Sequence, residues 1–280
     1  MNSMPPIDLV ALVPGKDDRE ALAGLLESRW QSLGIRHIHA ELLVHPRRDP
    51  GCFYEAPFVL QTYQRLATRA LVLFDHEGCG QESRSSGDLE IDLEGRLARS
   101  GWDDRARVVV IEPELENWVW SDSPHVDAIL GWSGRRPDLR RWLVENGFWP
   151  ASCSKPPRPK ETMDAALRQA RVRRSSSIFR QLAESVSLDR CQDAKFGRLR
   201  QLLGGWFSSH ASVMSHRDQS PVMDKAAIFD WSRLRRDARA LCTSNSQTSL
   251  SGSAPALILS QTTASNLRIK SIAIAAHPAV

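Results

Sequence analysis

Residues 7–26 read IDLVALVPGKDDREALAGLL, an apolar segment followed by a turn and an amphipathic segment. Branched aliphatic side chains dominate 7–13, which is typical of a strand buried on both faces of a parallel sheet. Pro14 and Gly15 end that strand, and Asp17 and Asp18 follow where acidic residues favour the first turn of a helix. The stretch therefore predicts a strand–turn–helix unit of an α/β fold.

The same alternation recurs along the first part of the chain. Strand-like segments lie at 35–45, 70–74 (ALVLF) and 108–111 (VVVI), and helical patterns lie between the strands at 19–34, 58–68 and 89–98. Strands and helices that alternate in this way form a mostly parallel sheet flanked by helices. After Pro113 the strand signals stop, and helices are expected at 114–121, 124–132, 138–146, 161–173, 176–187 and 193–206.

Composition and charge limit the class of protein and its organisation. The 280 residues carry a net charge of +4 and five scattered cysteines without a CxxC pair, so a disulfide framework or zinc ribbon is not expected. With no membrane-length apolar run and no signal peptide, we expect a soluble, cytoplasmic protein with no membrane partner. Basic residues number 13 against 22 acidic ones in 1–134, but 16 against 7 in 135–207.

This asymmetry suggests three parts. We expect an acidic α/β core at 1–134 and a basic, Trp-rich helical extension at 135–207 that packs on it. Residues 208–280 are rich in Ser, Thr and Ala, with one basic helical patch at 226–241. Low sustained periodicity predicts a largely disordered tail there.

Acidic side chains cluster where predicted strands end. Asp75 and Glu77 follow the strand at 70–74, and Glu112 and Glu114 follow the strand at 108–111. The carboxyl ends of parallel strands share one edge, and alternate residues of an extended chain point the same way. Converging carboxylates favour a hard cation, so Mg²⁺ or Mn²⁺ is the expected cofactor.

These clusters give a ranked set of candidate site residues. Asp75, Glu77 and Glu112 are the predicted catalytic residues, and the same three with Glu114 are the predicted metal ligands. Secondary candidates are Asp17, Asp18, Glu20 and Glu116. Each cluster also fits a structural role, because acidic residues cap helices and stabilise turns.

The basic region offers a nucleic-acid-binding surface. Its predicted contacts are Arg135, Arg136, Arg168, Arg171, Arg173 and Arg174. Tryptophans interleaved with arginines can stack on bases, although irregular helical spacing also suits core packing; the residues concerned are Trp118, Trp120, Trp132, Trp142 and Trp149. No phosphate-binding GxxxxGK[ST] loop and no GxSxG elbow is present.

The strand followed by D-x-E at 75–77 and the strand followed by E-x-E at 112–114 resemble the TOPRIM-like fold of topoisomerases, primases and related nucleases. That resemblance implies Mg²⁺-dependent phosphodiester chemistry. Two departures are evident: Pro14-Gly15 stands where the family places a Glu, and the second motif is D-x-E instead of D-x-D.

A closer likeness covers roughly residues 5–207. The phrases HPRRDPGCF (45–53), ALVLFDHEGCG (70–80), ARVVVIEPELENWVWSDSPHVDAILGW (106–132) and RSSSIFRQLAESVSLDRC (174–191) resemble the small TOPRIM-like component of bacterial methylation-associated defence systems. This implies a role against phage and, as partners, other proteins of the same operon, including a DNA methyltransferase.

Three functional hypotheses follow. The first is a defence component that processes phosphodiesters with Mg²⁺, with DNA as a candidate ligand. The second is a catalytically degenerate scaffold or sensor that binds other defence proteins or DNA. The third is a nucleotide-processing enzyme that uses the same metal site. The sequence leaves open whether the chain is an enzyme.

Overall fold

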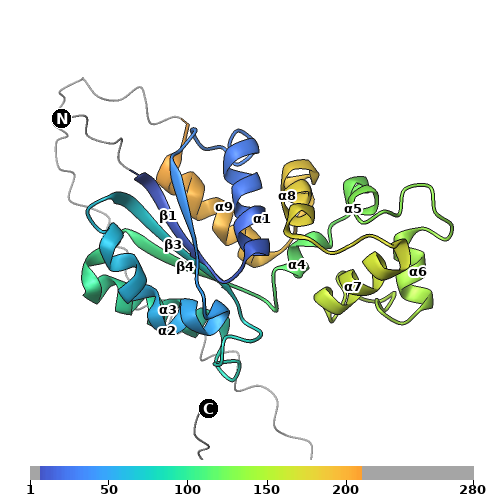
Figure 1. Cartoon of the computed structure of the whole chain (residues 1–280), viewed down its shortest axis with the longest axis horizontal. Helices are drawn as coiled ribbons and strands as arrows, with labels where there is room; N and C mark the ends of the chain where they lie inside the picture. Colours follow the sequence, from blue (N-terminus) through green and yellow to red (C-terminus); the bar gives the residue numbers. More distant parts are fainter. Residues whose placement is uncertain (1–6, 210–280) are drawn as a thin grey trace, which may run out of the picture. The chain divides into compact units, whose positions relative to one another are not determined.

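A single parallel sheet of four strands organises the described part of the chain. The structure is a computed structural model that describes residues 7–209, which lie within one compact unit. The strand order is β2-β1-β3-β4, with β1 (Ile7–Val13), β2 (Ala40–Val44), β3 (Ala67–Asp75) and β4 (Ala106–Ile111) (Figure 1). An α/β fold with a parallel sheet flanked by helices is therefore confirmed. The predicted tail beyond residue 209, with its patch at 226–241, lies outside the described residues.

Helices cover both faces of the sheet. Helix α1 (Lys16–Ser28) lies on one face, and α2 (Arg48–Leu60) and α3 (Ser86–Leu97) lie side by side on the other (Figure 1). Leu9 and Ala11 of β1 pack into the hydrophobic cluster that contains α1, whereas Val10 and Leu12 pack into the cluster that contains α2 and α3. Burial of both faces explains why the strands read as continuous apolar runs.

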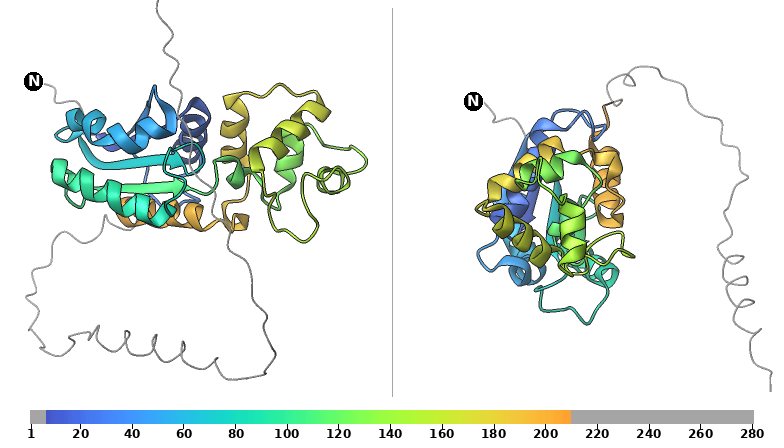
Figure 2. Two further views of the ribbon diagram at one scale, coloured as in Figure 1. Left: turned by 90° about the horizontal axis from the view of Figure 1, so that it is seen from below. Right: turned by 90° about the vertical axis from the view of Figure 1, so that its right-hand side faces the viewer.

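The chain after β4 is helical. Its helices are α4 (Glu116–Val119), α5 (Pro124–Ile129), α6 (Leu139–Glu145), α7 (Pro159–Ala170), α8 (Ser176–Ser185) and α9 (Ala194–Phe207). Helix α8 packs on α1 and α9 contacts β4, while the green-to-yellow helices α5, α6 and α7 gather beyond the carboxyl ends of the strands (Figures 1 and 2). Among residues 7–209, no helix has the length and apolar character needed to cross a membrane.

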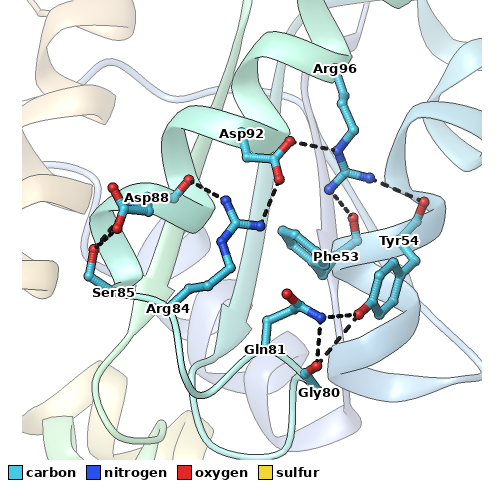
Figure 3. Close-up of polar contacts among 9 residues, drawn as sticks. All are labelled: Phe53, Tyr54, Gly80, Gln81, Arg84, Ser85, Asp88, Asp92 and Arg96. Atoms are coloured by element: carbon cyan, nitrogen blue, oxygen red, sulfur yellow. Dashed lines mark hydrogen bonds and ion pairs between the residues drawn. The ribbon is translucent and has the colours of Figure 1, made fainter.

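The prediction of a helix at 58–68 is wrong, because α2 spans Arg48–Leu60 and contains two prolines. Pro50 lies in the first turn, where a missing N–H does not interrupt the helix. Pro57 cannot donate to the carbonyl group of Phe53, and that carbonyl instead accepts a hydrogen bond of 2.6 Å from Nη2 of Arg96 in α3 (Figure 3). A tertiary contact thus supplies the donor that the proline removes. The predicted strand at 35–45 is also shorter, since β2 is confined to Ala40–Val44.

Two glutamates of α3 satisfy the free edge of β4. The backbone N–H of Val110 donates to Oε1 of Glu90, and that of Val108 donates to Oε1 of Glu94, both at 3.0 Å. Glu90 is buried and also accepts a hydrogen bond of 2.8 Å from Nζ of Lys195 in α9. These contacts occupy N–H groups that an edge strand would otherwise leave open to pairing with another chain.

The five tryptophans considered for base stacking belong to the core. Trp120, Trp132 and Trp149 are buried, and their indole N–H groups donate to the carbonyl oxygens of Pro159, Ala166 and Cys153. Trp118 and Trp142 are partly buried and pack against the same hydrophobic cluster. The packing interpretation, not base stacking, is the one that these contacts support.

Candidate functional site

A hollow of about 390 Å³, which we term the first hollow, lies at the carboxyl ends of β1 and β3. In the order β2-β1-β3-β4, the chain passes from β1 to β2 on one side of it and then crosses to β3 on the other side. The neighbours β1 and β3 therefore form a topological switch point. The loops that follow these strands diverge there, which is where open α/β sheets bind ligands. The first hollow is lined by Pro14, Gly15, Lys16, Asp17, Asp18, Val44, His45, Pro46, Arg48, Asp49, Asp75, Leu115, Glu116, Lys160 and Arg174.

Three aspartates from three segments form what we term the acidic centre: Asp18 of α1, Asp49 of α2 and Asp75 at the end of β3. The backbone N–H of Asp75 donates to Oδ1 of Asp49 at 2.9 Å. Asp18 is only 6% exposed. Within residues 7–209, the buried Oδ1 atoms of Asp18 and Asp75 have no hydrogen-bond partner.

Burial and mutual repulsion raise the pKa values of these carboxyl groups. Burial raises the pKa of Asp18 to about 7, and the nearby carboxylates of Asp49 and Glu116 add to the shift. The pKa of Asp75 is also raised well above its ordinary value, first by burial and then by Asp18 and Asp49. Burial likewise raises the pKa of Asp49. The centre therefore favours either protons or a cation.

Arg174 closes one side of the first hollow. Its Nη2 atom lies 3.1 Å from Oδ2 of Asp17 and also pairs with Glu116, and its Nη1 atom lies 2.9 Å from Oδ1 of Asp164. Asp17, Glu116 and Asp164 belong to α1, α4 and α7, so one guanidinium joins three helices. Glu116 is 3% exposed, and this ion pair compensates its buried charge.

A second hollow of about 520 Å³ adjoins the first. The two hollows share Arg48, Asp49, Asp75 and Lys160, and the second is also lined by Arg47, Pro50, Glu77, Gly78, Glu114, Arg158 and Glu161. Oε1 of Glu114 accepts a hydrogen bond of 2.8 Å from the backbone N–H of Lys160 in the first turn of α7. Burial raises the pKa of Glu114 to about 7.

His45 holds the turn that leads into α2, the helix that carries Asp49. This histidine is buried; its Nδ1 accepts a hydrogen bond of 3.1 Å from the backbone N–H of Arg47, and its Nε2 lies 3.2 Å from Oε2 of Glu55. The accepting Nδ1 assigns the ring hydrogen of the neutral form to Nε2. A Cβ atom on Gly51 would lie 2.0 Å from Nδ1 of His45, so only glycine fits at that position.

The loop after β3 is fixed on its outer side by the contacts drawn in Figure 3. Nη1 of Arg84 donates to Oδ2 of Asp92 at 2.9 Å, and Nε2 of Gln81 donates to the Tyr54 hydroxyl at 2.6 Å (Figure 3). Because this loop begins directly after Asp75 and includes Glu77, these contacts constrain one wall of the second hollow.

The structure brings together most, but not all, of the predicted carboxylates. Asp17, Asp18 and Glu116 line the first hollow, Glu77 and Glu114 line the second, and Asp75 lines both. Glu112 is exposed and is not part of either lining, since the chain leaves β4 at Ile111 and no longer alternates as a strand does. Glu20 instead pairs with Arg19 and Arg180 at 2.8 and 3.2 Å.

The predicted arginines separate into two groups. Arg174 lies in the first hollow and is bound to carboxylates. The other five lie around the turns at 131–136 and 168–173, and all five are exposed there.

The sequence prediction missed Asp49 and the cations of the first hollow, which are Lys16, Arg48 and Lys160. Asp49 follows β2 in the segment HPRRDP, so the strand-end rule applied to β2 would have found it. Lys160 offers no comparable signal, because its place depends on how α7 packs.

The predicted metal ligands do not form a complete protein cage. Within the described range 7–209, no group of three or more His, Cys, Asp or Glu side chains is arranged to hold a metal ion. Asp18 and Asp75 nevertheless both line the first hollow and each have one unpartnered oxygen, so they provide two hard carboxylate ligands there. Such a pair fits Mg²⁺, which commonly binds through one or two carboxylates, with water and substrate phosphate as its remaining ligands.

Comparisons with protein-family models, with curated proteins and with solved structures gave no match. The site geometry is therefore the basis for the function proposed next.

Proposed function

We propose that this chain is a TOPRIM-like protein that processes phosphodiesters with Mg²⁺ or Mn²⁺ at the acidic centre. The observation that carries the proposal is the pair of buried, unpartnered carboxylate oxygens of Asp18 and Asp75 at the switch point of the sheet. The resemblance of the segments at 45–53, 70–80, 106–132 and 174–191 supports a role as a cytoplasmic component of a bacterial methylation-associated anti-phage system. A DNA methyltransferase from the same operon is the partner that this role implies.

The residues around the acidic centre suit a phosphate ester. Asp18 and Asp75 would hold the metal, with Asp49 beside them, while Lys16, Arg48 and Lys160 line the first hollow and provide positive charge for phosphate oxygens. A bound divalent cation supplies the charge that polarises a phosphoryl oxygen and lowers the pKa of an attacking water.

In this proposal, Arg174 binds carboxylates of the protein and not the phosphate. Its single positive charge, shared by Asp17 and Glu116, offsets part of the negative charge next to the acidic centre.

A second candidate function is a non-catalytic scaffold or sensor. It is favoured by Pro14-Gly15 in place of the TOPRIM glutamate, and by the ion pairs through which Asp17, Glu116 and Asp164 join three helices. In that case, the carboxylates stabilise the packing of α1, α4 and α7 without binding metal.

A thermal melt of the full chain in increasing Mg²⁺ or Mn²⁺ distinguishes these functions. A ligand that binds the folded state stabilises it by about 2.7 kcal/mol at 100 times its Kd, which corresponds to a rise in Tm of about 5–10 °C for a folded unit of this size. We expect that rise for the wild type and for Glu112→Gln, but not for Asp75→Asn. The two variants remove one carboxylate charge each, and Glu112 lies outside both hollows.

Turnover completes the test. Metal-dependent cleavage of a simple phosphodiester such as bis(p-nitrophenyl) phosphate by the wild type, lost in Asp75→Asn, would support the proposal. No rise in Tm up to 10 mM metal would favour the scaffold, and turnover of nucleotides without diester cleavage would favour the nucleotide-processing enzyme.

A further inference from the structure

Five arginines gather at the end of α7 that lies away from the acidic centre. We term this group the arginine turn; its members are Arg135, Arg136, Arg168, Arg171 and Arg173. Nη2 of Arg135 donates a hydrogen bond of 2.9 Å to the carbonyl oxygen of Ala170. A Cβ atom on Gly131 would lie 2.6 Å from Cγ2 of Val172. The turns at 131–136 and 168–173 are therefore in direct contact.

The charge of the arginine turn is not neutralised within the described part of the chain. None of its five guanidinium groups has a carboxylate oxygen of residues 7–209 within 4.0 Å. By contrast, the acids on the exposed side of α7 are paired: Glu161 with Arg158 at 2.8 Å and Asp164 with Arg174 at 2.9 Å. Among residues 7–209, Lys160 and Arg168 are thus the charged side chains of α7 that have no oppositely charged partner within 4.0 Å.

Helix α7 connects the arginine turn to the site. Lys160, in its first turn, lines both hollows, and Arg171 is the residue that ends the helix. The helix has 12 residues, which at a rise of about 1.5 Å per residue gives a length of about 18 Å. This length sets the approximate separation between Lys160, which lines both hollows, and Arg171 at the far end of the helix.

We infer that α7 and the arginine turn form a track for a nucleic-acid strand, of which one phosphate reaches the acidic centre while others bind the arginines. The inference rests on the proposed function only for the phosphate of the nucleic acid that reaches the acidic centre. Arginine binds phosphate oxygens through paired N–H groups, and successive phosphates match cations placed along a line. At about 3.4 Å per nucleotide along a duplex strand, 18 Å corresponds to about five nucleotides. A dinucleotide is too short to engage both ends.

Fluorescence anisotropy of the full chain tests the track. The probes are a labelled 12-nucleotide thymidine strand and a labelled thymidine dinucleotide, measured in EDTA so that binding does not depend on metal. The test variant is Arg168→Gln/Arg173→Gln. Its control, Arg65→Gln/Arg99→Gln, also removes two exposed arginines, neither of which lines the first or the second hollow.

We expect a result that depends on the length of the probe and on which arginines are replaced. Each lost phosphate contact lowers the slope of log K against log[salt] by about 0.7 for a single strand, so the test variant should lose about 1.4 in slope and about tenfold in affinity for the 12-mer. The dinucleotide, which has a single internal phosphate, should lose at most about half as much slope, and the control should bind both probes as the wild type does.

Three outcomes would overturn the inference: an unchanged salt slope in the test variant, an equal loss with both probes, or competition by polyglutamate as strong as that by unlabelled 12-mer. The last would point to an acidic protein partner instead. Failure of the metal titration would leave this measurement interpretable, because it contains no metal. Conversely, a metal response with an unchanged salt slope would leave the proposed function standing and remove the track.

Discussion

The backbone N–H of Asp75 donates a hydrogen bond of 2.9 Å to Oδ1 of Asp49. This bond joins the first turn of α2 to the end of β3 and brings two carboxyl groups together from positions 26 residues apart. It uses one oxygen of Asp49, whereas Oδ1 of Asp75 has no hydrogen-bond partner among residues 7–209. The bond therefore fixes the backbone at Asp75, while the unpartnered oxygen of its side chain favours a proton or a cation.

Asp18→Asn should remove part of the dependence of stability on pH. Since burial raises the pKa of Asp18 to about 7, its contribution to stability is fully present below its ordinary pKa near 3.8 and is lost as the pH rises through about 7. Metal-free wild type should therefore lose about 2–3 kcal/mol of unfolding free energy between pH 5 and pH 8.5 that the variant retains.

Urea denaturation at the two pH values measures this difference. Glu112→Gln, which removes an exposed carboxylate, should behave as the wild type does. An Asp18→Asn protein that loses as much stability as the wild type would show that this carboxyl group is not the one that titrates.

Arg174 and Glu116 should be strongly coupled in a double-mutant cycle. Arg174→Met leaves the charge of Glu116, which is 3% exposed, without its ion-pair partner, so it should cost about 3–5 kcal/mol of unfolding free energy. Arg174→Met/Glu116→Gln should recover most of that loss, because the uncompensated charge is gone.

The control pair for this cycle is Arg141 and Glu145, which lie 2.7 Å apart on the surface of α6. Their coupling energy should stay at about 0.3–0.5 kcal/mol, as is typical of exposed pairs one helical turn apart. Equal coupling energies for the two pairs would contradict the compensating role of Arg174.

Glu90→Ala should loosen the edge of the sheet at β4. The substitution removes the acceptor of the Val110 N–H and the partner of Lys195, and we expect a cost of about 3 kcal/mol. Glu90→Gln should cost less, because an amide oxygen can still accept the backbone hydrogen bond.

Hydrogen exchange at the Val110 amide provides the local readout. Exchange should be faster in Glu90→Ala than in Glu90→Gln, while the amide of Val72 in the central strand β3 should change only with global stability. Unchanged protection of Val110 in both variants would mean that another group of the protein satisfies this edge.

Local sequence predicted the elements better than their ends. The apolar runs at 7–13, 70–74 and 108–111 mark three of the strands, because a strand covered on both faces needs apolar side chains at successive positions. The predicted helix at 58–68 overlaps only the end of α2, which begins at Arg48 and contains Pro50 and Pro57. The carbonyl group of Phe53, which Pro57 cannot pair, accepts its hydrogen bond from Arg96, a residue of another helix.

The sequence by itself determined the α/β class, the parallel sheet and the edge at which acidic residues collect. Apolar runs indicate strands buried on two faces, and the alternation of strands with helices indicates that the strands are parallel. Only the tertiary structure decided which carboxylates meet. It placed Asp49 against Asp75, left Glu112 exposed and brought Arg174 to Glu116. The physical reason is that convergence depends on the paths of the loops and the packing of helices distant along the chain, which no local periodicity encodes.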